Sequence, residues 1–162
     1  MTDNVATDTA TVRFPEDCVP KGAPVYVFNQ LHTQKTPEAI WAVLIDALSW
    51  PEFYKNCKRP ALDAGHERLE AGTTFHWTTF GVRVHTTIKE FEPHERLAWR
   101  GVTPGGGSAY HGWVIEKTET GCRIATEETQ RGIVPWLGRW YLRGAMHKQH
   151  QRWLEGLAGA AK

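Results

Sequence analysis

Residues 74–89 read TFHWTTFGVRVHTTIK, two runs of β-branched and aromatic residues separated by Gly81. This pattern predicts an antiparallel hairpin whose two-residue turn is Gly81-Val82. The turn sets Phe75 opposite Ile88, and alternate residues on each strand then share one face. That face carries most of the apolar side chains, so we expect it to point into the core.

The strands continue as a meander beyond this hairpin. Residues 92–95 (EPHE) reverse the chain, and residues 103–108 form a loop rich in proline and glycine. Residues 119–121 (ETG) close a last hairpin. Continued outward from that turn, the strand pairing places His111 directly opposite Glu128.

The flanking segments predict one more strand and three helices. Residues 25–33 are rich in β-forming residues. Thr36 as a cap, followed by proline, predicts a short helix to about Leu48, and Ser49 begins a second one. A long helix is expected over residues 135–158. Its inward face is predicted to carry Trp136, Leu137, Trp140, Gly144, His147, Gln151, Leu154 and Leu157.

The composition predicts one globular domain. The chain has 162 residues, and 19 Lys and Arg against 18 Asp and Glu give a net charge of +1, which argues against nucleic-acid binding. Residues 1–22 have little apolar content, so we expect a flexible leader there and a single domain over residues 23–162.

The location of the protein is predicted from what the sequence lacks. The three cysteines show neither zinc nor disulfide spacing, which favours a reducing compartment. The sequence shows no signal peptide and no transmembrane segment. We therefore expect a cytoplasmic protein.

Several motifs in this order of elements resemble those of the polyketide cyclase/dehydrase and START-like superfamily (SRPBCC). They are residues 36–41 (TPEAIW), 49–53 (SWPEF), 71–75 (AGTTF), 88–93 (IKEFEP) with 97–99 (LAW), and 121–128 (GCRIATEE). The resemblance covers about residues 25–157. It implies an α+β helix-grip fold, in which a curved seven-stranded antiparallel sheet wraps a long C-terminal helix and two short helices follow the first strand. It leaves the activity open, because the superfamily includes carriers, cyclases, hydrolytic enzymes and chaperone activators.

A cavity between the sheet and the long helix is the expected ligand site. The polar residues predicted to point into it are Asn29, Thr86, His111, Thr126, Glu128 and His147. Because burial raises the pKa of a carboxylic acid and an adjacent imidazolium lowers it, the pair of His111 and Glu128 is suited to proton transfer. In a cyclase-like reaction His147 is a possible third group, and Asn29 or Thr126 would hold a carbonyl oxygen.

Two other interpretations of this pair stay open. His111 and Glu128 can form a satisfied buried contact that only stabilises the sheet. Alternatively, Glu127 points inward and Glu128 faces the solvent.

Four tryptophans and one glycine complete the predicted ligand site. They are Trp77, Trp99, Trp113, Trp140 and Gly144. Indole rings stack on planar ligands, so a flat aromatic or polyketide-like molecule is the expected partner. The alternative is that some of these rings only fill the core.

The sequence shows no motif for phosphate binding, for a nucleophilic hydrolase or for a dinucleotide cofactor. The glycines at 105–107 have no following helix and no Lys-Ser or Lys-Thr, as a phosphate loop would. Neither a nucleophile elbow nor a dinucleotide fingerprint is present. We predict no cofactor, and no metal, because no acidic residue accompanies His147 and His150 at helical spacing.

Three function classes follow. The first is a cyclase- or dehydratase-like enzyme that needs no cofactor, and the second is a carrier with the same cavity but no chemistry. The third is a chaperone-activator-like interaction protein, which would use an outer surface such as the basic side chains Arg139 and Arg143. The sequence is compatible with a monomer or a homodimer.

Overall fold

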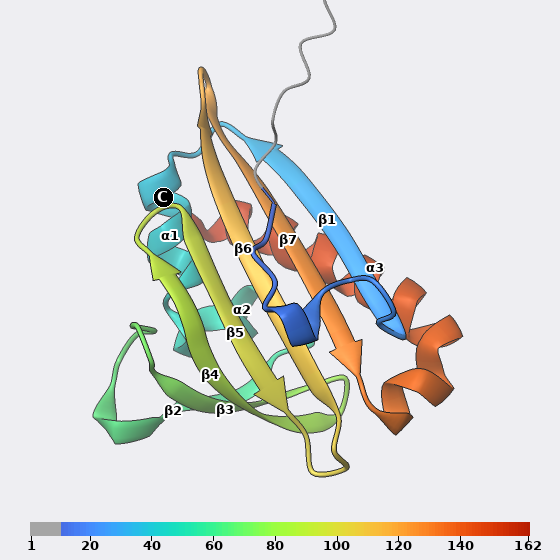
Figure 1. The fold of residues 1–162 in the computed structure, drawn as a ribbon. Coiled ribbons are helices and arrows are strands. Elements are labelled where there is room, and N and C mark those ends of the chain that lie inside the picture. Colours follow the sequence, from blue (N-terminus) through green and yellow to red (C-terminus); the bar gives the residue numbers. More distant parts are fainter. Residues whose placement is uncertain (1–10) are drawn as a thin grey trace, which may run out of the picture.

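Seven antiparallel strands form one curved sheet, with α-helices on its concave side (Figure 1). The structure is a computed structural model, and it describes residues 11–162. The sheet order is β1-β7-β6-β5-β4-β3-β2. The strands are β1 (Val25–Thr33), β2 (Lys58–Leu62), β3 (Thr74–Thr79), β4 (Val82–Glu92), β5 (Arg96–Val102), β6 (Ser108–Thr118) and β7 (Gly121–Arg131). The α-helices are α1 (Pro37–Leu44), α2 (Trp50–Phe53) and α3 (Ile133–Ala160), and the 3-10 helices are η1 (Glu16–Cys18), η2 (Ala47–Ser49) and η3 (Asp63–Gly65).

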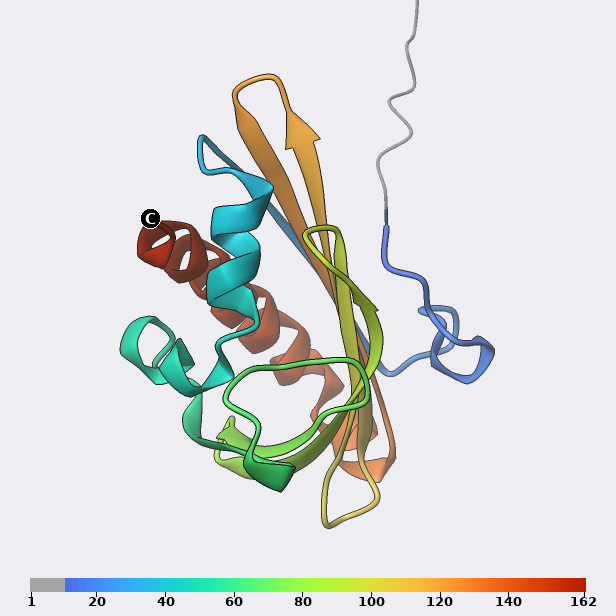
Figure 2. The same ribbon diagram turned by 90° about the vertical axis from the view of Figure 1, so that its left-hand side faces the viewer.

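The core lies between the concave face of the sheet and the helices. Figure 2 shows α1 and α3 on that side of the sheet and residues 11–22 on the other. Four fully buried tryptophans, Trp50, Trp99, Trp113 and Trp153, form the centre of the core. This architecture confirms the predicted α+β helix-grip fold with seven strands.

The first helix is shorter than the sequence predicted. Thr36 caps its start, where its Oγ1 accepts a hydrogen bond from the backbone N–H of Ala39 (3.2 Å). It ends at Leu44 rather than near Leu48, and η2 follows. The indole N–H of Trp50 donates to the carbonyl oxygen of Leu44 (3.1 Å), which satisfies a backbone group at the helix end.

The two predicted hairpins differ in how well their registers agree with the structure. In β6–β7, His111 pairs with Glu128, as predicted. In β3–β4 the predicted register is wrong by two residues, because the turn is Phe80-Gly81 and Phe75 pairs with Thr86. Both turn residues have positive φ (50° and 76°), as a type I′ turn requires. A shift of two residues keeps every side chain on its predicted face.

Residues 11–22 differ from the predicted flexible leader, because they lie against the outer face of the sheet. Val12 is buried, and its backbone N–H donates to Oε2 of Glu127 (2.7 Å). A Cβ atom on Gly112 would lie 2.4 Å from a methyl group of Val12, so this glycine makes room for the segment. Cys18 is also buried, and its carbonyl oxygen accepts a hydrogen bond from Thr129 (2.8 Å). Residues 1–10 of the predicted leader lie outside the described residues.

Among residues 11–162, no helix has both the length and the apolar character needed to cross a membrane.

Candidate functional site

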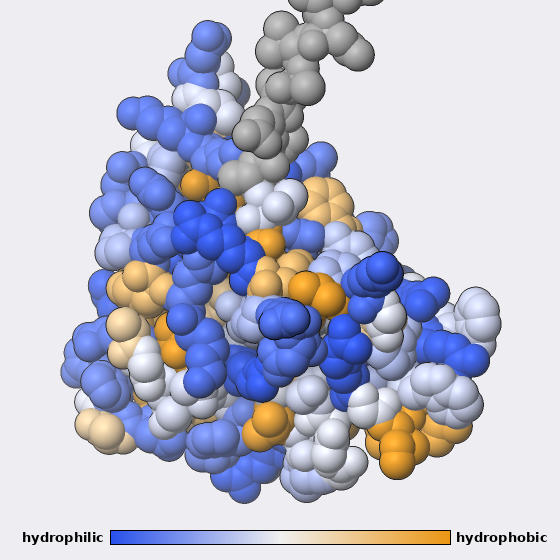
Figure 3. All heavy atoms as spheres, viewed as in Figure 1, coloured by the Kyte–Doolittle hydropathy of each residue, from blue (hydrophilic) through white to orange (hydrophobic). Residues whose placement is uncertain are grey.

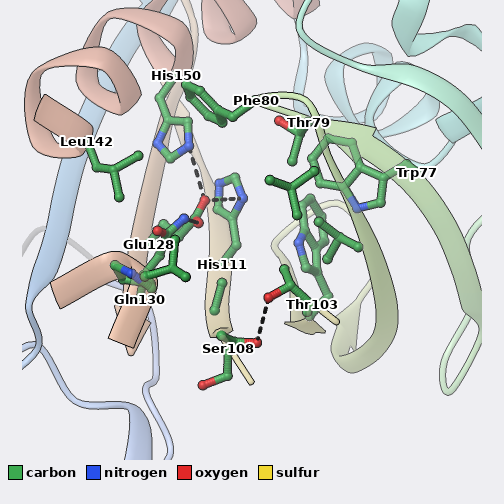
Figure 4. A pocket seen from close by; sticks show the side chains of 18 of the residues that line it. Trp77, Thr79, Phe80, Thr103, Ser108, His111, Glu128, Gln130, Leu142 and His150 are labelled. Atoms are coloured by element: carbon green, nitrogen blue, oxygen red, sulfur yellow. Dashed lines mark hydrogen bonds and ion pairs between the residues drawn. The ribbon is translucent and has the colours of Figure 1, made fainter. Parts of the chain in front are cut away.

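A pocket with a volume of about 140 Å³ lies between the sheet and α3 (Figure 4). Two of its lining residues are exposed and mark its mouth: Val82, directly after the β3–β4 turn, and Val134, at the start of α3. The β5–β6 loop contributes the lining residues Thr103 and Gly107. Because these three segments come from distant parts of the sequence, only the folded chain brings them together.

Aromatic and aliphatic side chains form most of the pocket wall. They include Tyr54, Trp77, Val84, Trp99, Leu142 and Trp153. The rings of Tyr54 and Trp153 stack with their centres 4.4 Å apart and their planes 9° from parallel. The indole N–H of Trp153 is buried without a hydrogen-bond partner in the structure.

Three buried ionisable side chains meet in the pocket: His111 on β6, Glu128 on β7 and His150 on α3. Oε2 of Glu128 lies 3.1 Å from Nδ1 of His111 and 3.2 Å from Nε2 of His150. The two imidazole rings stack, with centres 4.7 Å apart and planes 17° from parallel. Figure 4 shows both imidazoles directed at the same carboxylate. We call these three residues the His-Glu-His cluster.

The neighbours of His111 determine which of its ring nitrogens carries the proton. Nε2 lies 2.7 Å from Oγ1 of Thr126, and this oxygen also lies 3.0 Å from the carbonyl oxygen of Gly112. The hydroxyl has one proton, so it donates either to that carbonyl oxygen or to Nε2. A neutral His111 beside an ionised Glu128 carries its proton on Nδ1, because a lone pair there would face a carboxylate oxygen 3.1 Å away. In that state Nδ1–H donates to Glu128 and the hydroxyl of Thr126 donates to Nε2.

Burial and hydrogen bonding set the charges of the cluster. Burial lowers the pKa of His111 to about 3, because the apolar surroundings disfavour the imidazolium. Burial by itself would raise the pKa of Glu128, but the neighbouring His111 and His150 and a hydrogen bond from Gln130 (2.8 Å) outweigh it, so the pKa is lowered. Near pH 7 the site therefore combines a neutral His111 with a carboxylate, which is the protonation state of a general base.

The cluster also has the composition of a cation site. One ligand atom from each of its residues lies within 4.8 Å of the other two, and two imidazoles with one carboxylate suit a transition metal. The acidic residue of this group, Glu128, lies on β7. A search for acidic residues at helical spacing from His147 and His150 could not find it. A second group, Asp63, His76 and His85, meets the same distance condition at a partly exposed position.

Several predicted site residues lie where the sequence placed them. His111, Glu128, Trp77 and Trp99 line the pocket. Glu127 points to the outer face, where Tyr26 donates to its carboxylate (2.7 Å), so the alternative with Glu127 inside is wrong.

Four other predicted residues are buried beside the pocket rather than in its wall: Asn29, Thr86, Trp113 and Thr126. The amide of Asn29 donates to Oε1 of Gln151 on α3 (3.1 Å). Thr86 accepts a hydrogen bond from the indole of Trp77 (3.0 Å), and Thr126 orients His111. The amide N–H of Asn29 and the hydroxyl of Thr126 thus have partners within the protein, and neither residue borders the space where a ligand carbonyl would lie.

The prediction for the inward face of α3 is wrong in its first half. Trp140, Gly144 and His147 are exposed, and Trp140 is 77% exposed. The buried face instead carries Met146, His150, Trp153, Leu154 and Leu157. Positions 146, 150, 153 and 157 have the i, i+4, i+7, i+11 spacing of a helix face, so the sequence did contain a signal for His150 and Trp153. The exposed aromatic residues of the first half obscured it.

Comparison with known proteins gives one family match. Residues 32–162 match the model of a family described as polyketide cyclase / dehydrase and lipid transport. No curated protein matches the chain significantly.

Solved structures share the fold over most of the chain. A hypothetical protein from Helicobacter pylori, jhp0584, is 29% identical with a TM-score of 0.90, covering 96% of this chain and 99% of the other. TTHA0849 from Thermus thermophilus is 20% identical with a TM-score of 0.69, covering 83% and 95%. The Zhui aromatase/cyclase from Streptomyces sp. R1128 is 14% identical with a TM-score of 0.67, covering 83% and 91%.

Proposed function

Because the chain belongs to the polyketide cyclase / dehydrase and lipid transport family, we propose that it binds a small planar molecule and catalyses a cyclisation or dehydration by proton transfer. The observation that carries the proposal is the His-Glu-His cluster, which lies in an aromatic pocket. An apolar wall with a few placed polar groups is the usual composition of a ligand site.

The size of the pocket restricts the ligand. A cavity of about 150 Å³ holds one benzene molecule, so a volume of about 140 Å³ accommodates roughly one ring inside. Further rings or a chain would extend through the mouth. The carboxylate of Glu128 in the pocket wall favours a ligand that has an acidic C–H group next to a carbonyl.

The cluster supplies a base and then an acid. The carboxylate of Glu128, held by Nδ1–H of His111, accepts a proton from the carbon next to the ligand carbonyl, which leaves an enolate. The enolate carbon attacks a second carbonyl of the same molecule, so a carbon–carbon bond forms and the second oxygen takes up a proton. In the dehydration, the cluster removes another proton from carbon and returns a proton to the departing hydroxyl, which leaves as water.

One neighbour with the same fold, from Streptomyces, is named an aromatase/cyclase, and this name supports the proposed class of reaction. The second candidate is a carrier that binds the same kind of molecule without chemistry, and the mostly apolar wall favours it. In either case the protein is expected in the cytoplasm, and its three buried free cysteines are compatible with a reducing compartment.

The first test identifies the ligand and then separates the two candidates. Native mass spectrometry of the freshly purified protein would reveal a bound small molecule. As a defined substrate, the two-ring ketone 2-tetralone reports proton abstraction through deuterium uptake from heavy water, measured by NMR.

Glu128→Gln should reduce enzyme-dependent deuterium uptake by about a hundredfold and change the affinity for 2-tetralone only a few fold. The matched control is Glu127→Gln, because the adjacent carboxylate lies on the opposite face and should leave the rate unchanged. A bound ligand without deuterium uptake in the unmodified protein would support the carrier, and uptake unaffected by Glu128→Gln would exclude this residue from the mechanism.

A further inference from the structure

The first half of α3 exposes large apolar side chains to the solvent. We call this surface the α3 apolar face; its residues are Ile133, Val134, Trp136, Leu137, Trp140 and Tyr141. They are 54–77% exposed. Figure 3 shows apolar atoms gathered at the lower right, where α3 begins in Figure 1. Contiguous apolar surface of this kind marks an interaction site in a folded protein.

The charged side chains that α3 itself carries along this stretch are all positive. Between residues 133 and 154 the helix contains Arg139, Arg143, Lys148 and Arg152 but no Asp or Glu. The guanidinium of Arg139 lies 4.7 Å from the ring centre of Trp136 and 5.3 Å from that of Trp140. Aromatic and apolar side chains are thus mixed with cations on one stretch of helix.

The face adjoins the mouth of the pocket. Val134 belongs to the face and also lines the pocket. Pro135 and Leu142, on the same stretch of helix, line the pocket as well. Val82, which is exposed at the β3–β4 turn, lines the mouth opposite the helix. Whatever covers the α3 apolar face therefore also lies next to the entrance of the pocket.

We propose that the α3 apolar face docks the protein onto an anionic lipid bilayer. Trp and Tyr side chains favour the interface between lipid and water, and Leu and Ile reach the acyl region. Basic side chains near the surface each add about 1 kcal/mol of attraction to anionic lipids. The helix lies on the bilayer and does not cross it, in agreement with the lack of a spanning helix among residues 11–162.

The charge pattern favours lipid over a second copy of the chain. In a twofold contact the same surface meets itself, so Arg139 and its basic neighbours would face their own copies. The first acidic residue of α3 is Glu155, in the half of the helix that packs into the core. An anionic bilayer instead complements every charge on this stretch.

Docking places the pocket mouth at the lipid surface, where an apolar ligand would enter without crossing water. This consequence rests on the proposed ligand-binding function, whereas the docking itself does not. Docking is therefore measured with the protein and vesicles alone, in the absence of any ligand.

Vesicle flotation tests the docking. The full-length protein should float with vesicles of phosphatidylcholine containing about one third phosphatidylglycerol, and about tenfold less with phosphatidylcholine alone. Raising the salt should release it, since screening weakens the attraction between exposed charges. Brominated lipids should quench part of the tryptophan fluorescence, and Trp136→Phe with Trp140→Phe should remove that quenching.

The double variant Leu137→Asp with Trp140→Ser should reduce the bound fraction about tenfold without changing thermal stability, because both side chains are exposed. Leu48→Asp is the matched control, since Leu48 is exposed on η2 and does not belong to the α3 apolar face, and it should float like the unmodified protein.

Two results would overturn the proposal. One is the absence of flotation with anionic vesicles. The other is a stable dimer in solution that Leu137→Asp dissociates, which would make a second copy the occupant of the face. Deuterium uptake by 2-tetralone is measured separately, so neither result decides the proposed catalytic function.

Discussion

The two halves of α3 belong to one continuous helix, but apolar side chains are buried in one half and exposed in the other. The second half buries Met146, His150, Trp153 and Leu157 against the sheet and helices. The first half exposes Trp136 and the other residues of the α3 apolar face. Apolar side chains in a helix therefore do not by themselves identify its buried side. What differs is the surface that each half meets.

The comparison can be tested first by the same substitution in each half. Trp153→Ala removes a fully buried indole and should lower the free energy of unfolding by about 3–5 kcal/mol. Trp140→Ala removes an exposed indole and should change it by no more than about 0.5 kcal/mol. Urea unfolding of both variants measures the difference. Similar losses would mean that Trp140 packs in solution against a surface absent from this structure.

The second prediction compares the two histidines that are three residues apart on α3. His150→Phe should lower deuterium uptake by 2-tetralone about a hundredfold, because it removes a nitrogen 3.2 Å from Glu128. His147→Phe changes an exposed side chain and should leave the rate unchanged. His150→Gln serves as a second variant if the phenylalanine prevents folding, and thermal melts identify such a failure. Full activity in both His150 variants would remove this residue from the site.

The third prediction concerns the pH dependence of stability. His111 takes up a proton near its ordinary value of 6.5 in the unfolded chain but near 3 in the folded protein. Between these values the unfolded state binds more protons, so its contribution to stability falls as the pH falls. From pH 7 to pH 5 the loss should be about 2 kcal/mol for this group alone. Denaturation at several pH values measures the slope, which His111→Gln should reduce and His147→Gln should not.

The last prediction compares two glycines of α3. A Cβ on Gly156 would lie 2.8 Å from the carbonyl oxygen of Phe53, so Gly156→Ala should cost about 1–3 kcal/mol. Gly144 has nothing within 4 Å of that position, and Gly144→Ala should stabilise the helix by about 0.8–1 kcal/mol. Differential scanning calorimetry compares them. Equal and favourable effects would show that the second half of the helix is not packed as closely as the structure indicates.

The reliability of the sequence predictions follows from how local each interaction is. The β6–β7 register was correct because a short turn fixes it, and this register brought His111 opposite Glu128. The β3–β4 register was off by two residues, since the sequence did not reveal that Phe80 adopts positive φ. The faces of both strands were nevertheless correct, because side chains alternate with a period of two.

The candidate site was predicted only in part for the same reason. His111 and Glu128 belong to neighbouring strands and could be paired from the turn between them. His150 comes from a helix whose rotation about its axis depends on packing against distant elements. The predicted face followed the helical period from Trp136 and Trp140, and it therefore included His147 rather than His150. Residues 11–22 were misjudged because the sheet, rather than the segment itself, provides the apolar surface that Val12 covers.

By itself, the sequence determined the order of the elements, the inward faces of the strands and the pairing of His111 with Glu128. These depend on turns, caps and periodicity, which act over a few residues. Its motifs also carried the family resemblance that implied the helix-grip fold. The tertiary structure decided which face of α3 is buried, the joining of His150 to the pair, the position of the pocket mouth and the exposure of the α3 apolar face. Each of these depends on the position in which α3 packs against the curved sheet. That position is set by the free energy of the whole packed chain rather than by that of any one segment.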